Sequence, residues 1–438
     1  MKYFSLQNKQ HIVSFEDAVV QGLAPDKGLY FPERIPAFEK DFIDNIEKQD
    51  DLDIAYAAIK PFVGDEIPEA TLRQIIADTL SFPFPVEKVA GNIYALELFH
   101  GPTLAFKDVG ARFMAGCLGY FRTNDTRPVT VLVATSGDTG GAVAHGFYSV
   151  PGVRVVILYP SGKVSTLQEK QLTTLNGNIT ALEIAGTFDD CQRMVKTAFL
   201  DAELQAHCLL TSANSINVAR WLPQMFYYLL AWKQLKTSYP NVVFSVPSGN
   251  FGNICAGMMA AAMGLPVKHF VASTNVNDTV PRFMQSGQYA PSKATPTLSN
   301  AMDVADPSNF VRILELFANS LPALKEKLTS ISFDDKATVT TMEQVWKEHQ
   351  YMLDPHGAVG YLGLQQYLQQ TAATNTADNT AGVFLETAHP VKFADTAPAS
   401  LQDKIVTPEK VQSLYALEKK AVQLPNDYKA LKDWLIAN

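Results

Sequence analysis

One lysine stands out among the residues that could do covalent chemistry. Lys107 follows a Gly-Pro turn in the segment His-Gly-Pro-Thr-Leu-Ala-Phe-Lys-Asp (100–108), at the expected start of a helix. The positive end of a helix dipole and burial both disfavour the ammonium form of lysine. A lysine held neutral can form a Schiff base with an aldehyde cofactor. The lysine alone still favours a solvated helix start, because solvated lysines are the rule.

A glycine-rich turn late in the chain has the composition of an anion-binding loop. Residues 247–253 read Pro-Ser-Gly-Asn-Phe-Gly-Asn and lie between an expected strand and an expected helix. Glycines permit a tight bend, and the helix that follows presents free backbone amides to an anion such as phosphate. Gly and Asn also favour turns for local reasons, so a turn without a ligand is equally compatible with this pattern.

An earlier turn, Thr-Ser-Gly-Asp-Thr-Gly-Gly at 135–141, also connects an expected strand to an expected helix. Its spacing differs from the Gly-x-Gly-x-x-Gly of dinucleotide-binding folds, and the next strand ends in Tyr159-Pro160 rather than in an acid that could hold a ribose. No Gly-Lys-Ser/Thr follows the bend, which argues against a P-loop. Asp138 has two interpretations, as a ligand-binding residue or as an Asx residue that stabilises the turn.

The middle of the chain alternates between strand and helix patterns. Most of these strands are apolar on both faces, which predicts an α/β fold with mostly parallel sheets covered by helices on both sides. We expect an N-terminal domain over 1–85, a core of two α/β subdomains over 86–400 with a more helical stretch at 300–370, and a helical tail over 401–438 that packs on the core. The expected strands cover 129–134, 153–159, 179–184, 208–211, 242–246, 269–273 and 382–385. The expected helices include 15–21 (capped by Ser14), 166–175, 188–200, 218–235 and 254–263. Residues 40–80 are also expected to be helical, with breaks at Pro61 and Pro68.

Composition limits the class of protein. Of 438 residues, 47% are hydrophobic and 18% are charged, so a large buried core is expected. A net charge of -8 argues against a nucleic-acid-binding protein. The four cysteines lack the spacing of a metal or dithiol site, and the N-terminus lacks the apolar stretch of a signal peptide, which favours a cytoplasmic protein without a metal centre. The longest uncharged apolar run, 254–267, is too short to cross a membrane.

The residues at 101–108 closely resemble the cofactor-lysine motif of the threonine synthase family, pyridoxal-phosphate enzymes of fold type II (tryptophan synthase β-like). The resemblance extends over most of the chain and includes Glu-Thr-Ala-His-Pro at 386–390. It implies that Lys107 binds pyridoxal 5'-phosphate and that Thr387 meets the cofactor ring. A neutral hydroxyl there would leave the ring nitrogen largely unprotonated, which favours elimination and replacement over transamination. The implied grip on the cofactor phosphate consists of Gly249, Asn250, Phe251, Gly252 and Asn253.

The resemblance also implies where the substrate binds. The turn at 135–141 would hold the α-carboxylate of the substrate through Thr135, Ser136, Asp138 and Thr139. Two further loops, after the strands at 153–159 and 208–211, should open on the same edge of the sheet, where Lys163 and Arg220 could stabilise a departing phosphate. The alternative is a solvated Lys163 and an Arg220 paired with a carboxylate. The helping side chains would be Ser165, Asn214, Ser215 and Asn217.

The family resemblance implies a lyase of amino-acid biosynthesis, which converts O-phospho-L-homoserine and water to L-threonine and phosphate in the last step of threonine biosynthesis. A related pyridoxal-phosphate lyase, such as a serine or threonine dehydratase, is the nearest alternative, since it would share the lysine and the phosphate grip. A non-catalytic protein acting through binding is the alternative from another class, although it should have lost one of these features. The family includes monomers and dimers, so the sequence leaves open a monomer or a homodimer.

Overall fold

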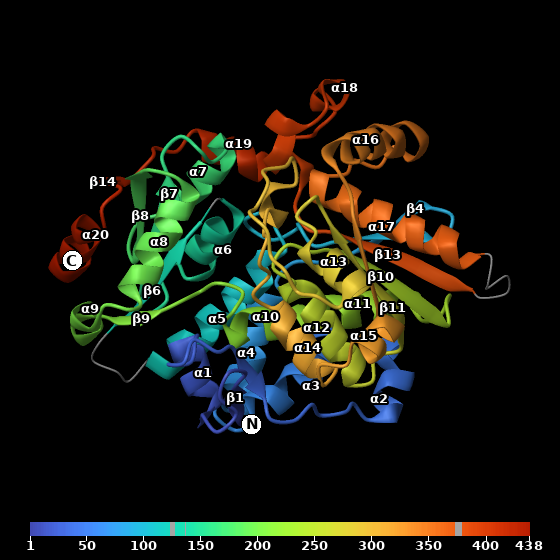
Figure 1. Ribbon diagram of the computed structural model, residues 1–438, viewed down its shortest axis with the longest axis horizontal. Coiled ribbons are helices and arrows are strands. Elements are labelled where there is room, and N and C mark those ends of the chain that lie inside the picture. Colours follow the sequence, from blue (N-terminus) through green and yellow to red (C-terminus); the bar gives the residue numbers. More distant parts are fainter. Residues whose placement is uncertain (123–127, 136, 373–378) are drawn as a thin grey trace.

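The computed structural model describes residues 1–122, 128–135, 137–372 and 379–438, and it contains three sheets surrounded by helices (Figure 1). Two of these sheets are mostly parallel and lie on opposite sides of the molecule in this view, with the N-terminal segment below and between them. This arrangement confirms the α/β class, the parallel sheets and the small N-terminal unit that the sequence predicts.

The larger sheet has six strands. All neighbouring strands are parallel except the pair β4 and β5, which is antiparallel. One face packs on α16 (Asp335–His349) and α17 (Pro355–Ala372), and the other on α11 (Met225–Leu235) and α12 (Gly252–Ala262). Burial on both faces explains the uninterrupted apolar runs. The strand order is β12 (Leu328–Ser332), β11 (Val267–Thr274), β10 (Asn241–Pro247), β13 (Thr380–Glu386), β5 (Ile93–Glu97) and β4 (Val86–Ala90).

The smaller sheet has five strands, and all of its pairs are parallel. One face packs on α8 (Phe188–Ala198) and the terminal helix α20 (Tyr428–Ala437), and the other on α5 (Lys107–Arg122) and α6 (Asp138–Gly146). The strand order is β14 (Val422–Pro425), β8 (Ile179–Ala185), β7 (Val153–Pro160), β6 (Val129–Ala134) and β9 (Leu209–Thr211).

The C-terminal tail differs from the expected helical segment. It crosses the molecule to the smaller sheet and adds β14 as an edge strand beside β8, with Val422 opposite Leu182 (Figure 1). Helices α19 (Glu409–Tyr415) and α20 flank this strand. The strand is largely exposed and has only four residues. Its pairing with a distant strand determines its conformation, and such a partner leaves no local signal in the sequence.

The N-terminal segment folds into a three-stranded antiparallel sheet and four α-helices whose apolar residues join the main core. Ser14 caps α1 (Phe15–Gln21) in a capping box with Asp17, as predicted. The prediction that Pro61 breaks a helix was wrong, because this proline lies in the last turn of α3 (Asp51–Val63). The other elements of this segment are β1 (Tyr3–Ser5), β2 (Ile12–Val13), β3 (Tyr30–Pro32), α2 (Lys40–Asp44), η1 (Ile46–Lys48) and α4 (Glu69–Thr79), which starts after Pro68 as expected.

The expected helix over 218–235 is interrupted. Pro223 has no N–H to donate, and the chain forms α10 (Val218–Trp221), the short 3-10 turn η2 (Leu222–Gln224) and then α11. The remaining helices are α7 (Thr166–Thr173), α9 (Ala202–His207), α13 (Thr279–Ser286), η3 (Asn300–Met302), α14 (Phe310–Leu316), α15 (Leu321–Lys327), η4 (Pro390–Thr396) and α18 (Ala399–Gln402). No helix among the described residues is both long and apolar enough to cross a membrane.

Candidate active site

Lys107 is the first residue of α5, and the loop before it is fixed by the next residue, Asp108. The Asp108 carboxylate accepts hydrogen bonds from the backbone N–H of Thr103 (2.9 Å) and from its hydroxyl (2.5 Å). Leu104 has a left-handed backbone with φ 61°, which turns the chain into the helix. Burial raises the pKa of Asp108 to about 6 against the effect of these bonds, because the charged carboxylate lies out of contact with water.

The Lys107 side chain is half-buried, and its amine forms no hydrogen bond or ion pair with any described residue. Burial lowers the pKa of this amine, the Asp138 carboxylate opposes the shift, and the cations Lys392 and Arg220 add to it. An amine with a lowered pKa that is not held in an ion pair is better able to act as a nucleophile.

Thr387 lies beside the Lys107 loop. The chain leaving β13 forms an isolated antiparallel bridge with that loop, in which the Phe106 N–H donates to the Thr387 carbonyl (2.8 Å) and the His389 N–H donates to the Leu104 carbonyl (3.0 Å). Thr387 itself is buried. The two motifs are far apart in the sequence, and main-chain hydrogen bonds hold them together.

The turn after β10 presents the start of α12 at the carboxyl end of the larger sheet. Phe251 adopts a left-handed backbone with φ 59°, and a side chain at Gly249 would place its Cβ 2.7 Å from the Cα of Met302. The tight bend therefore requires Gly249. The first amides of α12, at Gly252 and beyond, are those that a helix start leaves without intrahelical partners.

Asn253 gives this turn an unpartnered donor. Its Oδ1 accepts a hydrogen bond from the Tyr228 hydroxyl (2.6 Å), whereas its buried Nδ2 has no partner among the described residues. A buried donor without an acceptor is costly unless a ligand satisfies it. The free amides and this donor fit the phosphate of a cofactor such as pyridoxal phosphate.

Two adjacent tyrosines of α11 connect the Lys107 loop with this turn. The Tyr227 hydroxyl donates to the carbonyl of Phe106, directly before Lys107, and the Tyr228 hydroxyl binds Asn253. Burial raises the pKa of both tyrosines well above the ordinary value, so both hydroxyls keep their protons. One helix therefore supports the lysine and the anion-binding turn.

The turn after β6 is organised by Thr135 and Asp138. The Thr135 hydroxyl accepts from the N–H groups of Gly137 and Gly140, both at 2.9 Å. Asp138 is buried at the start of α6 and accepts from Gln168 Nε2 (3.0 Å), while Thr139 is half-buried in the same turn. Ser136 lies outside the described residues.

Lys392 of η4 completes this region, and the sequence analysis missed it. Its buried Nζ lies 3.1 Å from Asp138 Oδ1 and donates to Gln171 Oε1 (2.6 Å) and to the Thr103 carbonyl (2.7 Å). The charges of Lys392 and of Lys107 hold the pKa of Asp138 below its ordinary range although burial alone would raise it. The lysine comes two residues after the 386–390 motif, but no spacing rule in the sequence marks it as a partner of Asp138.

The predicted donors for a substrate phosphate fall into two groups. Arg220 is buried and donates to the Ala213 carbonyl. Among the described residues it forms no ion pair with a carboxylate, and its Nε has no hydrogen-bond partner. Burial lowers the pKa of its guanidinium to about 10. Ser215 lies against the β10 turn, where its hydroxyl accepts from Asn250 Nδ2 (2.6 Å). The residues of the other group are exposed or serve the local structure. Lys163 is exposed, and Ser165 caps α7. Asn217 caps α10 and donates to the Val19 carbonyl, and the Asn214 N–H donates to the Ser212 hydroxyl.

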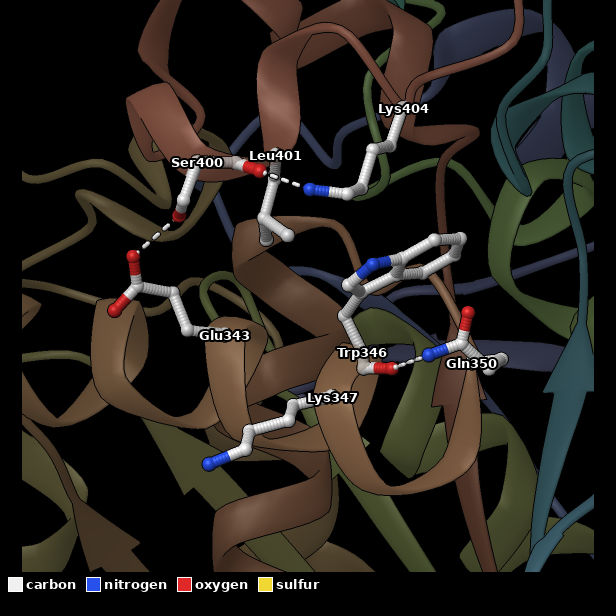
Figure 2. Close-up of a pocket in the computed structure, with 7 residues that line it drawn as sticks. All are labelled: Glu343, Trp346, Lys347, Gln350, Ser400, Leu401 and Lys404. Carbon is white, nitrogen blue, oxygen red and sulfur yellow. Dashed lines mark hydrogen bonds between the residues drawn. The ribbon is translucent and has the colours of Figure 1, made fainter.

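A surface hollow of about 390 Å³ lies between α16 and α18 (Figure 2). Several of its polar groups bind one another: Glu343 accepts from the Ser400 hydroxyl (2.5 Å), and Lys404 Nζ donates to the Ser400 carbonyl (2.7 Å). None of the predicted site residues lines it. The lining residues are Glu343, Trp346, Lys347, Gln350, Ser400, Leu401 and Lys404.

Comparisons with known proteins identify the family of this chain. The family model described as "Pyridoxal-phosphate dependent enzyme" matches residues 77–383, and the models for the N terminus and the C-terminal part of threonine synthase match 2–80 and 358–435. The threonine synthase of Escherichia coli (strain K12) is 46% identical over 433 residues, which cover 99% of this chain and 98% of that protein. The threonine synthase of Serratia marcescens is 45% identical and covers 100% of this chain and 99% of that protein.

Solved structures give the same relationship. The crystal structure of threonine synthase from Escherichia coli has a TM-score of 0.89 at 44% identity and covers 100% of both chains. A pyridoxal-phosphate-bound threonine synthase from Brucella melitensis has a TM-score of 0.92 at 33% identity, covering 100% of this chain and 99% of that chain. A threonine deaminase from Solanum lycopersicum, at 15% identity and a TM-score of 0.56, shares only the fold. The chain belongs to the threonine synthase family of pyridoxal-phosphate-dependent enzymes.

Proposed function

We propose that this protein converts O-phospho-L-homoserine and water to L-threonine and phosphate, the final step of threonine biosynthesis. The supporting observation is the set of contacts among three sequence-distant segments. The Lys107 loop pairs with Thr387 through the main chain, and neighbouring tyrosines of α11 bind the Lys107 loop and the β10 turn. This arrangement fits pyridoxal phosphate. When bound, the cofactor supplies an electron sink that stabilises negative charge on carbons near the substrate amine.

The residues of this chain would divide the remaining work as follows. Lys107 would hold the cofactor through its aldehyde, and its amine would serve as the base that moves protons at Cα and Cβ of the substrate. One mobile base can serve several carbons only if the substrate is held rigidly, which is the role of the β6 turn with Thr135, Asp138 and Thr139. The buried guanidinium of Arg220 and the hydroxyl of Ser215 would stabilise the phosphate as it leaves Cγ.

The phosphate grip is assigned to Gly249, Asn250, Phe251, Gly252 and Asn253. Asn250 acts indirectly, because its side chain already binds Ser215 and the Ser308 N–H (2.6 Å). Thr387 is assigned to the ring nitrogen. We assign Ser136, Lys163, Ser165, Asn214 and Asn217 to the periphery of the substrate site, a cytoplasmic location to the protein, and a monomer or homodimer as its assembly.

The decisive experiment measures both products. Purified protein loaded with pyridoxal phosphate is incubated with O-phosphohomoserine, and phosphate and threonine are quantified in parallel. We expect the two products in equal amounts, because water replaces phosphate once in each turnover. Formation of a ketoacid from serine, with no phosphate released from O-phosphohomoserine, would instead establish a dehydratase. Absence of both reactions would favour a binding protein.

A further inference from the structure

Lys392 is the centre of a buried polar cluster that joins both α/β subdomains. It lies on η4, after β13 of the larger sheet, and its amine reaches Asp138 and Gln171 on helices that follow strands of the smaller sheet. Its third partner is the Thr103 carbonyl in the Lys107 loop. The amine is shielded from water, since the side chain is 0% exposed.

The location of Asp138 raises a charge problem. Asp138 begins α6 in the turn that the proposed function assigns to the α-carboxylate of the substrate. An ionised aspartate there repels that carboxylate, and the repulsion is large because the group is buried and poorly screened. Gln168, the other partner of Asp138, is neutral and contributes a hydrogen bond but no positive charge. Only Lys392 forms an ion pair with Asp138 among the described residues.

We propose that Lys392 is a positioning residue for substrate binding, which neutralises Asp138 and fixes it against the Lys107 loop so that the β6 turn can accept an anionic carboxylate. This inference rests on the proposed function. It predicts that Lys392 contributes to the affinity for amino-acid ligands through their carboxylate and has little direct effect on the chemical step.

The test is a double-mutant cycle on the cofactor-loaded protein with Lys392→Met, Asp138→Asn and the double variant. Methionine keeps the length of the side chain, and the Thr103 carbonyl keeps its bond from Gln171 Nε2 (3.0 Å). We expect Lys392→Met to raise KM for O-phosphohomoserine by at least about tenfold and to change kcat by less than about threefold, because an uncompensated buried charge weakens binding. Calorimetric titration with L-threonine should show the same weakening of Kd.

Rescue separates charge compensation from packing. In the double variant, the side chain at position 138 carries no charge, so KM and Kd should return to within about threefold of the values of the unaltered protein. Unchanged KM and Kd in Lys392→Met, or a defect that Asp138→Asn fails to relieve, would overturn the inference. If Lys392→Met does not fold, Asp138→Asn alone remains decisive: threonine should bind at least as tightly as before, and a tenfold loss would contradict the idea.

Lys419→Met is the matched control. Lys419 pairs with two carboxylates, Glu169 (2.7 Å) and Glu183 (2.9 Å), but its side chain is 36% exposed and touches none of the proposed site residues. Its loss should leave KM and Kd unchanged, and a shift as large as that of Lys392→Met would reject a local effect at Asp138. Failure of the proposed function is recognised separately, because the unaltered protein would then release no phosphate from O-phosphohomoserine.

Discussion

The two glycine-rich turns share one connection, from a parallel strand to a helix N-terminus, yet they satisfy their polar groups differently. The β6 turn is closed on itself, since the Thr135 hydroxyl binds two of its own amides and Asp138 is bound by Gln168 and Lys392. The β10 turn has an unpaired hydrogen-bond donor, because Asn253 Nδ2 is buried without a partner among the described residues.

This difference fits two kinds of ligand, a cofactor that stays bound and a substrate that exchanges. Unpaired, preorganised donors suit an anion that stays bound, such as a cofactor phosphate. Its hydrogen bonds offset the free-energy cost of burying those donors. A turn completed by protein bonds remains stable while a substrate comes and goes. The Lys107 loop is held by Tyr227 of α11 at the Phe106 carbonyl, and the Asp138 carboxylate of the β6 turn acts on the Lys107 amine by opposing the fall of its pKa.

The largest expected effect comes from replacing Lys107. Lys107→Ala should lower turnover by at least about 10³-fold and abolish the near-visible absorption band of the lysine-bound cofactor, because no other amine occupies this position. Both turns should stay intact, so the variant should still bind pyridoxal phosphate non-covalently in equilibrium dialysis. Lys419→Met serves as the control and should keep the band. A Lys107→Ala protein with an unaltered band would reject the lysine assignment.

The next largest effect concerns cofactor binding at the β10 turn. Asn253→Asp keeps the acceptor for Tyr228 but replaces the free donor with a negatively charged oxygen. Pyridoxal phosphate should then bind the apoprotein about 10- to 100-fold more weakly, the range for a lost hydrogen bond to a charged group. A fluorescence titration measures this affinity.

Tyr228→Phe is the milder comparison for Asn253→Asp, since it removes the hydroxyl that binds Asn253 at Oδ1 (2.6 Å) and at the main-chain carbonyl (3.1 Å) but leaves the Asn253 side chain in place. Its affinity loss should stay below about tenfold, as is usual for one neutral hydrogen bond. An unchanged cofactor affinity in Asn253→Asp would place the phosphate elsewhere.

The last expected effect is on stability rather than on binding, and it is a pH dependence in the Lys107 loop. Burial raises the pKa of Asp108 to about 6, so the folded protein binds this proton more tightly than the unfolded chain does. The resulting stabilisation is complete below the unfolded pKa near 4 and is lost as pH rises through about 6. The free energy of unfolding, relative to that of Asp108→Asn, should fall by roughly 2 kcal/mol between about pH 4 and pH 7. Urea unfolding at a series of pH values measures it, and a difference that stays flat with pH would contradict the raised pKa.

Much of the fold could be predicted because its signals are local. The capping box at Ser14, the strand Val129–Ala134 and the short helix–strand alternation follow from side chains within a few residues of one another. Several strands at or near the sheet edges carried too little signal: β4, β5, β12 and the tail strand β14 were not predicted. Their pairing partners lie far away in the sequence or carry weak patterns themselves, so hydrogen bonding to those partners decided their conformation.

The sequence by itself determined which residues could react and which turns could bind anions. The Gly-Pro turn before Lys107 and the glycine-rich helix starts each consist of consecutive residues, so they can be recognised without the fold. Tertiary structure alone decided what surrounds them. The pairing of Thr387 with the Lys107 loop, the two tyrosines that join that loop to Asn253, and the contact of Lys392 with Asp138 all connect residues that are far apart in the chain. Electrostatic and hydrogen-bond energies depend on distance in space, and the folded chain brings these groups within reach of one another.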